Sequence, residues 1–210
     1  EPRIIRQFKE NLEFTGGTAV KYDTSYLFGA GTHQALAKGE EIGRRFHSAP
    51  VVRLSDAKPM QLGHVAEADA RWRLYAFAGK ADSSAPGSAI HRLADWLETN
   101  PASPVVKYTR PGEDIDAVID LRAVFQQTFD QLAYENMPSL LKPKTGKLGL
   151  QDHEKVFCVD HKGAGDIFDL RGINRDSGCM VVVRPDQYTA HILPLDAFDE
   201  LAAFFAGFLR

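Results

Sequence analysis

Hydrophobic residues in the middle of the chain recur at spacings typical of a strand and a helix in alternation. Residues 71–79, RWRLYAFAG, are apolar on both faces, which predicts an interior strand covered on two sides. Residues 89–99 then carry apolar side chains on one helical face, and the Asn-Pro pair that follows ends this helix. Strands are predicted at 105–109 and at 115–125, although the second range fits a short helix about equally well. Strand, helix and strand in this order predict a βαβ unit with parallel strands.

The last third of the chain predicts an antiparallel hairpin followed by a helix. Residues 126–152 are polar and interrupted by prolines, and we interpret them as an insertion before a strand at 155–160. Two apolar runs within 179–193 fold about the turn at 184–187, which predicts a hairpin. Asp196 is the predicted cap of the final helix. The residues expected on its packed face are Phe198, Leu201, Ala202, Phe205 and Leu209.

The first 45 residues predict a segment that belongs to another unit. Apolar residues recur at helical spacing from Ile4 to Leu12, Gly16-Gly17 ends this helix, and 18–22, TAVKY, predicts a short strand. The chain begins at Glu1 without an initiator Met and enters the helix almost at once, so we expect it to be cut from a longer polypeptide. We therefore divide the chain into a tail, 1–45, and a main domain, 46–210.

The order of elements in the main domain predicts a thioredoxin-like α/β fold. From about residue 58 the pattern is strand, helix, strand, then a hairpin and a helix, which gives a mixed sheet with helices on both faces. Thiol enzymes of this fold carry Cys-x-x-Cys at the start of the first helix, where the helix dipole stabilises a thiolate. Residues 82–86, Asp-Ser-Ser-Ala-Pro, stand there instead. The two cysteines, Cys158 and Cys179, lie in or beside predicted buried strands, so we expect inert thiols.

The composition of the chain indicates which kinds of partner and which cellular compartment to expect. The chain has 210 residues, 44% of them hydrophobic, and a net charge of -3, which fits a globular domain and offers no basic surface for nucleic acid. The hydrophobic runs are shorter than the ~18 residues that a membrane-spanning helix needs. With only two cysteines and no signal-peptide pattern, we expect a cytoplasmic protein with both thiols reduced.

Several short patterns resemble binding sites, but each has a simpler structural interpretation. His153, Cys158, Asp160 and His161 include zinc-ligand types, yet their spacing matches no compact zinc motif. The run Gly29-Ala30-Gly31-Thr32-His33 lacks the third glycine of a dinucleotide loop, and we interpret 163–166, Gly-Ala-Gly-Asp, as a turn. Arg184 is either an anion contact or, as we favour, a solvated side chain at the hairpin turn. The remaining histidines considered are dispersed: His47, His64, His91 and His191. We assign no catalytic, cofactor-binding or metal-binding residue.

Longer blocks carry a family resemblance. The stretches GRRFHSAPVVRL, RWRLYAFAG, SPVVKYTRPGEDIDAVIDLRAVFQ, EKVFCVD, GDIFDLRGINR and MVVVRPDQYTAHILPLDAF resemble the C-terminal part of the phenol 2-monooxygenase family of FAD-dependent aromatic hydroxylases, and most closely the members that act on 3-hydroxybenzoate. The similarity covers nearly the whole chain. In more distant relatives a glycine often follows the Pro-Asp of the hairpin, where this chain has Gln187, so the turn type stays open.

The resemblance implies a fold, a parent enzyme and a partner. It implies that the main domain is the thioredoxin-like C-terminal domain associated with dimer formation, and that the opening helix with 18–22 is the tail of a flavin- and substrate-binding region. The parent enzyme would use FAD and NADPH to hydroxylate phenol or 3-hydroxybenzoate, and its flavin and substrate residues would lie in the missing N-terminal part.

Our leading hypothesis is a structural and homodimerisation portion of such a hydroxylase, which binds no cofactor and performs no catalysis by itself. The alternatives are a free-standing thiol enzyme and a small-ligand-binding module that uses a cleft between the tail and the main domain. The final helix, with four clustered phenylalanines, is the first candidate for the dimer contact. These residues are Phe198, Phe204, Phe205 and Phe208.

Overall fold

The computed structural model describes residues 3–23, 25–160 and 165–210. The α-helices within these residues are α1 (Arg3–Thr15), α2 (Ala89–Thr99), α3 (Pro104–Tyr108), α4 (Ile167–Leu170) and α5 (Phe198–Ala206). The strands are β1 (Pro50–Arg53), β2 (Lys58–Gln61), β3 (Trp72–Phe77), β4 (Ile119–Phe125), β5 (Lys144–Thr145), β6 (Leu150–Gln151), β7 (Val156–Val159), β8 (Cys179–Val183) and β9 (Thr189–Leu193). Short 3-10 turns are η1 (Gln34–Leu36), η2 (Leu62–Val65), η3 (Tyr134–Asn136) and η4 (Ser139–Leu141).

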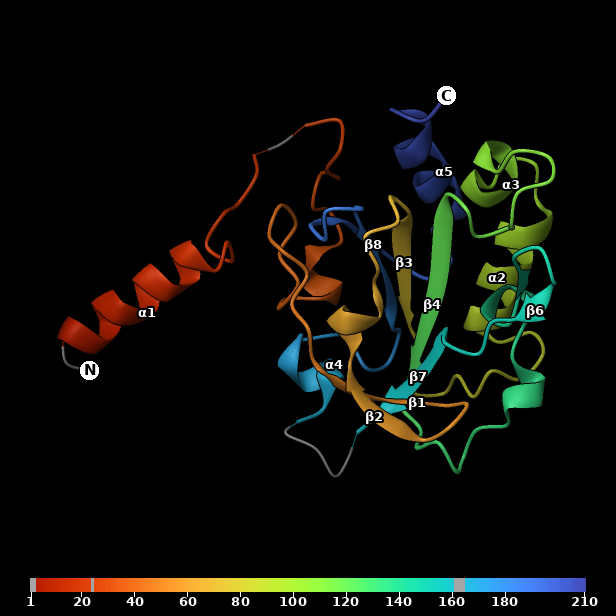
Figure 1. Cartoon of the computed structure of the whole chain (residues 1–210), viewed down its shortest axis with the longest axis horizontal. Helices are drawn as coiled ribbons and strands as arrows, with labels where there is room; N and C mark the ends of the chain where they lie inside the picture. Colours follow the sequence, from red (N-terminus) through yellow and green to blue (C-terminus); the bar gives the residue numbers. More distant parts are fainter. Residues whose placement is uncertain (1–2, 24, 161–164) are drawn as a thin grey trace.

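The main sheet is mixed, with the order β2-β1-β7-β4-β3-β8-β9 (Figure 1). Strand β4 pairs in parallel with β3 and β7, and the other neighbouring pairs are antiparallel. The segment β4-β3-β8-β9, followed by α5, reproduces the predicted order of a parallel pair, a hairpin and a final helix. The predicted thioredoxin-like arrangement is therefore confirmed at the level of topology. The interior strand at 71–79, the helix after residue 88, the strand at 155–160 and the hairpin are confirmed as β3, α2, β7 and β8-β9.

The strand predicted at 105–109 is wrong, because these residues form most of helix α3. Ser103 caps this helix by accepting a hydrogen bond from the Val106 N–H at 3.1 Å, and Pro104 occupies its first turn. Proline tolerates the first turn of a helix, and a serine cap offsets the strand preference of the valines. The parallel partner of β3 is instead β4, which confirms the strand interpretation of 115–125 from residue 119 onward.

Two smaller predictions near the ends of the chain also need correction. Residues 18–22 form no strand, and only an isolated bridge joins Lys21 to Arg44. The final helix begins after Ala197, which caps it without a side-chain hydrogen bond, so Asp196 is not the cap. The turn between β8 and β9 places Gln187 at φ 66°, a left-handed conformation that favours glycine.

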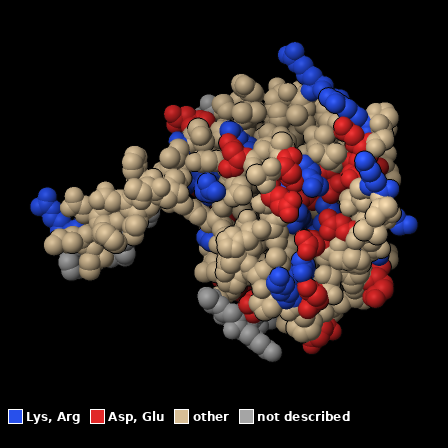
Figure 2. Space-filling view, in the orientation of Figure 1, with Lys and Arg blue, Asp and Glu red and all other residues tan. Residues whose placement is uncertain are grey.

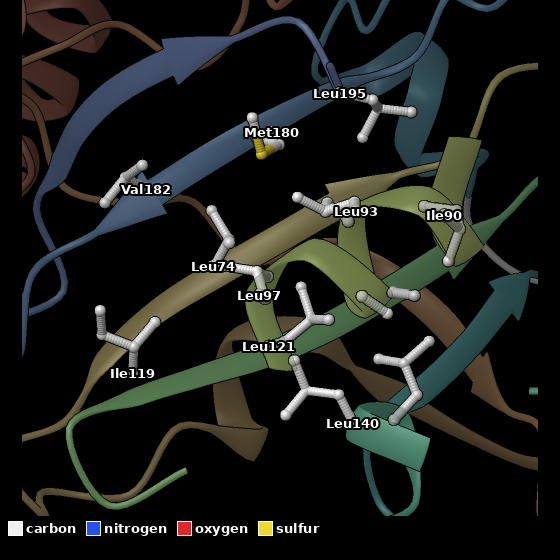
Figure 3. Close-up of a cluster of buried hydrophobic side chains, with 14 of the residues drawn as sticks. Leu74, Ile90, Leu93, Leu97, Ile119, Leu121, Leu140, Met180, Val182 and Leu195 are labelled. Atoms are coloured by element: carbon white, nitrogen blue, oxygen red, sulfur yellow. The ribbon is translucent and has the colours of Figure 1, made fainter. Parts of the chain in front are cut away.

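The helices α2, α3 and α5 cover one face of the sheet and bury a core that consists mostly of aliphatic side chains. Leucines of α2 point down onto β3 and β4, and the hairpin closes the side of this core (Figure 3). The members labelled there are Leu74, Ile90, Leu93, Leu97, Ile119, Leu121, Leu140, Met180, Val182 and Leu195. Alternation along β3 and β4 sends every second side chain to this face.

The opposite face of the sheet is covered by α4 and by an extended segment, residues 28–46, which we call the strap. The strap follows the outer edge of β9, where Gly29 N donates to Ala190 O at 2.8 Å and Gly43 N donates to Thr189 O at 2.9 Å. Two of its buried residues, Ala37 and Phe46, join a second core that contains phenylalanines of β3, β7 and α4. The strap therefore pairs with an edge that would otherwise expose unpaired backbone groups.

Helix α1 stands away from the sheet at the far end of a linker (Figure 1). Its apolar side chains face solvent, with Ile4 80% and Phe14 75% exposed. Acidic and basic side chains alternate over the body of the domain (Figure 2). No helix among the described residues is long and apolar enough to cross a lipid bilayer.

The two-sided core makes a stability prediction. Leu74 on β3 is fully buried, so Leu74→Ala should lower the free energy of unfolding by about 2–5 kcal/mol through lost burial and an unfilled cavity. Urea denaturation followed by circular dichroism measures this change. Leu148, which is 83% exposed, provides the control, because Leu148→Ala should change stability by less than ~0.5 kcal/mol. Equal losses in the two variants would contradict the assigned core.

Candidate functional site

The position that holds a dithiol in thioredoxin-like enzymes is occupied here by an internal carboxylate. Asp82 Oδ2 accepts a hydrogen bond from Ile90 N at 2.8 Å, and its Oδ1 accepts one from Ser84 N at 3.0 Å. Ser88 caps α2 by accepting from the N–H of His91. A carboxylate at a helix N-terminus stabilises the helix and occupies the place where a thiolate or an anion would bind. This end of the sheet therefore carries a structural cap.

Both cysteines are buried and have free thiols. Cys158 lies in β7, and burial raises the pKa of its thiol to about 12. Cys179 begins β8, where burial likewise raises the pKa of its thiol. Because the thiolate is the nucleophile in thiol chemistry, these environments disfavour attack at neutral pH. The expectation of inert thiols is consistent with this geometry.

The residues considered as metal ligands do not converge. Cys158 is buried in the sheet, whereas the ring of His153 packs against Tyr134 with centroids 5.3 Å apart. His161 lies outside the described residues. Within the described ranges, no group of three or more His, Cys, Asp or Glu side chains is placed to hold a metal ion.

The glycine-containing runs adopt loops that serve the fold. Gly29 passes so close to His191 that a Cβ at this position would lie 2.2 Å from the imidazole, and a 3-10 turn of three residues follows the run. His33 ends the run with Nε2 3.1 Å from Glu200 Oε2 of α5. In the second run, Asp166 caps α4 by accepting from Phe168 N at 2.8 Å. Positions 163 and 164 lie outside the described residues.

Arg184 is not the solvated side chain that the sequence favoured. Its Nη2 lies 2.7 Å from Asp186 Oδ2, and its guanidinium stacks 4.9 Å from the ring centroid of Phe28 in the strap. Tyr22 completes the aromatic contact at 5.4 Å. The arginine therefore joins the hairpin turn to the strap through an ion pair and cation–π contacts.

The other histidines considered have separate surroundings. His91 places Nε2 2.8 Å from the carbonyl oxygen of Asn136. Burial lowers the pKa of His191, whose ring packs against Phe204. His64 lies in η2, and His47 follows the strap. These positions come from different parts of the fold and do not form a common site.

A cluster of buried charges lies near the start of β3, β4 and β7, and sequence analysis missed it. Lys155 is fully buried, and its Nζ lies 2.6 Å from Asp116 Oδ2 and also contacts Asp120. Arg73 Nε lies 2.9 Å, and Arg122 Nε 2.8 Å, from Asp120 Oδ2. The signal was present in part, because Arg73 stands inside the run predicted to be covered on both faces, and Arg122 stands inside the predicted strand at 115–125.

The charges in this cluster are balanced, which argues for a structural role. Its outer members are Arg71, Asp69 and Asp152. Burial alone would raise the pKa of Asp120, but attraction to its three cationic partners outweighs burial and lowers it. A buried carboxylate that is fully paired is held ionised and is a poor proton acceptor. The cluster therefore fixes the ends of three strands, and its central carboxylate, Asp120, is not poised as a base.

A hollow of about 440 Å³ lies between the strap and the preceding segment. The amide of Gln34, one of its polar groups, is already bonded within the protein. The Gln34 amide nitrogen donates to the carbonyls of Ala37 and Glu40, and its oxygen accepts from Ile42 N. Ligand sites usually present a few convergent polar groups that are free to bind. The residues that line this hollow all belong to the predicted tail, so it is not the cleft between the tail and the main domain that the ligand-binding alternative requires.

The final helix uses most of its aromatic rings inside the domain. Phe205 is buried and packs edge-on against Trp72 at 5.5 Å, and Phe208 stacks on the same indole at 5.0 Å. Phe198 stacks on Trp96 at 4.9 Å. These contacts leave partly exposed ring edges, so a dimer contact at α5 stays a prediction.

Comparison with known proteins identifies related sequences. The profile of the family described as phenol hydroxylase, C-terminal dimerisation domain, matches residues 20–210. A 3-hydroxybenzoate 4-monooxygenase of Comamonas testosteroni is 52% identical over 206 residues, covering 98% of this chain and 32% of the relative. An FAD-dependent monooxygenase, terD, of Aspergillus terreus is 32% identical, covering 94% of this chain and 33% of the relative. The chain spans about a third of the length of these curated relatives.

Among solved structures, a domain of a possible thiol-disulfide isomerase from Cytophaga hutchinsonii has a TM-score of 0.48 and 13% identity. The match covers 79% of this chain and 93% of that domain.

Thiol titration tests the assignment of the cysteines. Native protein at pH 7.5 should react with Ellman's reagent only slowly at Cys158 and Cys179, because both thiols are buried and protonated. Unfolding in guanidinium should expose both to rapid reaction. A thiol that reacts rapidly in the folded chain would instead revive a thiol enzyme.

Substitution within the buried cluster tests its structural role. Asp120→Asn leaves buried cations without their partner, and it should lower the free energy of unfolding by about 3–5 kcal/mol at pH 7. Because the fold lowers the pKa of Asp120, its contribution is present at neutral pH and is lost as pH falls in the acid range. Asp56→Asn, at an exposed pair with Arg53, should cost far less. Denaturant unfolding at pH 7 and pH 3 measures the free energy of unfolding of the wild-type chain and of both variants.

Proposed function

Because this chain belongs to the family of phenol hydroxylase C-terminal dimerisation domains, we propose that it is the structural and dimerisation portion of an FAD-dependent aromatic hydroxylase. The observation that carries the proposal is the 52% identity to a 3-hydroxybenzoate 4-monooxygenase across 98% of this chain. The reaction of the whole enzyme would be hydroxylation of a phenol or of 3-hydroxybenzoate, with NADPH as reductant. Such an enzyme would act in the degradation of aromatic compounds in the cytoplasm.

We propose that this portion contributes no catalytic group and holds neither FAD nor NADPH by itself. Several observations support this division of labour. The dithiol position carries the capping carboxylate of Asp82, both thiols are buried, and the Gln34 amide in the hollow beside the strap is bonded within the protein. Binding and orientation of a flavin require such groups at the cofactor. These tasks are therefore assigned to the part of the parent enzyme that lies outside this chain.

Helix α1 is proposed to pack against that missing part. Its apolar residues are exposed, and an amphipathic helix of this kind is stable when its apolar face is buried. The predicted division at residue 46 stays a proposal. The contacts of the strap with β9 and the start of the family match at residue 20 favour a boundary between α1 and the strap.

Purified protein tests the proposal directly. The 210-residue chain should elute as a homodimer with twice the monomer mass in size-exclusion chromatography with light scattering. It should also be colourless, without flavin absorbance near 450 nm. A strictly monomeric chain at high micromolar concentration would count against dimerisation, and flavin that co-purifies in equal molar amount would overturn the proposed division of labour.

Two arginine substitutions distinguish the candidate dimer surfaces. Ala203 is exposed on α5, beside the packed rings, so Ala203→Arg should weaken a dimer formed there by at least tenfold while leaving the fold intact. Leu148 lies on the β5-β6 hairpin, away from α5 (Figure 1), so Leu148→Arg should preserve that dimer. If Ala203→Arg left the dimer intact and Leu148→Arg weakened it, α5 would be rejected as the contact. Analytical ultracentrifugation measures both dissociation constants.

A further inference from the structure

Glu40 lies inside the domain at the point where the strap crosses between two other segments. On one side Gly39 N donates to Arg171 O at 2.8 Å, and on the other Gly43 N donates to Thr189 O at 2.9 Å. The crossing is tight, because a Cβ on Gly39 would lie 2.8 Å from the backbone of Arg171. Glu40 is therefore the side chain that the strap inserts between α4 and β9, and it is only 1% exposed.

The polar atoms around Glu40 are poorly matched to a negative charge. Arg171 Nε lies 3.3 Å from Glu40 Oε1, but without hydrogen-bond geometry. Neither carboxylate oxygen, nor Thr189 Oγ1, has a protein hydrogen-bond partner of standard geometry among the described residues. An ionised carboxylate buried without hydrogen bonds is strongly disfavoured, and such a group takes up a proton instead. The pocket therefore suits the neutral acid better than the carboxylate.

Groups on several elements packed against Glu40 raise or lower its pKa. Burial raises the pKa of Glu40 to about 8, which outweighs the lowering by the charge of Arg171 and by the His47 backbone and Thr189 hydroxyl, which lie close to the carboxyl outside standard hydrogen-bond geometry. Two further titratable groups feel its charge, Cys179 of β8 and Tyr75 of β3, and burial raises the pKa of both. These two groups stay neutral at pH 7, so Arg171 is the charged neighbour that opposes the effect of burial.

We propose that Glu40 is a proton-dependent latch, whose neutral carboxyl holds residues 37–46 of the strap in place and whose ionisation favours their release from β9 and Arg171. The proposal does not depend on the function of the parent enzyme. The other end of the strap stays attached to β9, because Gly29 N donates to Ala190 O. The latch would thus couple pH to the covering of β9 and of the second core by residues 37–46.

The direction of the pH effect follows from proton linkage. The closed strap binds the Glu40 proton more tightly than an open strap, in which the carboxyl would reach water and regain its ordinary pKa of 4.5. The equilibrium constant for opening of the strap should therefore be lowest at pH values below 4.5. It should rise about tenfold for each pH unit toward pH 8 and level off above it.

Hydrogen exchange of the 210-residue chain measures this opening. Between pH 5.5 and pH 7.5, protection factors of amides in residues 37–46, corrected for intrinsic exchange, should fall by about a hundredfold. Amides of β3 should change much less. Glu40→Gln keeps a neutral side chain of similar size, so strap protection in this variant should be independent of pH. Strap and β3 protection that fall in step, or a wild-type strap that is insensitive to pH, would overturn the latch.

A control variant and a second measurement make the test independent of how well Glu40→Gln folds. Glu41 is the adjacent, exposed carboxylate, paired with Lys21 and Arg44, so Glu41→Gln should retain the wild-type pH dependence. Carboxyl ¹³C NMR of the wild-type chain should show Glu40 titrating with a midpoint near 8. A midpoint near the ordinary value, or loss of the pH dependence in Glu41→Gln, would reject Glu40 as the latch.

Discussion

The central constraint on this domain is the burial of both faces of β3 and β4. A sheet covered on two sides needs a layer on each face, and the chain supplies α2, α3 and α5 on one and α4 with the strap on the other. The charged residues Arg73, Asp120 and Arg122 share these strands, so they are buried with the apolar ones. Their mutual pairing, with Lys155, is what makes this burial tolerable.

The same constraint explains why both cysteines of this thioredoxin-like plan lie where a thiolate is disfavoured. In such a fold a reactive group sits where a strand ends and a helix begins, and here Asp82 ties that helix end to its own loop. The cysteines lie in strands covered on both faces, where a thiolate is disfavoured. The strand burial that stabilises the scaffold thus also disfavours a thiolate at either cysteine, which agrees with the proposed role in assembly.

The strap both covers the outer edge of the sheet and buries a carboxylic acid. Residues 28–46 pair with the outer edge of β9, and this pairing carries Glu40 into the interior. The chain therefore consists of a well-packed body and an exposed helix, α1. The strap lies between them in the sequence, and in our proposal its closure depends on the buried acid Glu40. The exposed apolar side chains of α1 suit contact with another apolar surface, whereas the body presents a mixture of acidic and basic side chains.

The sequence by itself determined the elements with strong periodicity, namely β3, α2, β7 and the β8-β9 hairpin, as well as the family resemblance and the lack of a dithiol. It misassigned α3, because the valines of 104–108 favour a strand locally while a serine cap and a helix packed alongside favour the helix. Only the tertiary structure decided the ionic cluster, the partners of Arg184 and the burial of Glu40. Each of these depends on groups far apart in sequence, whose charges interact strongly only after folding has removed water from between them.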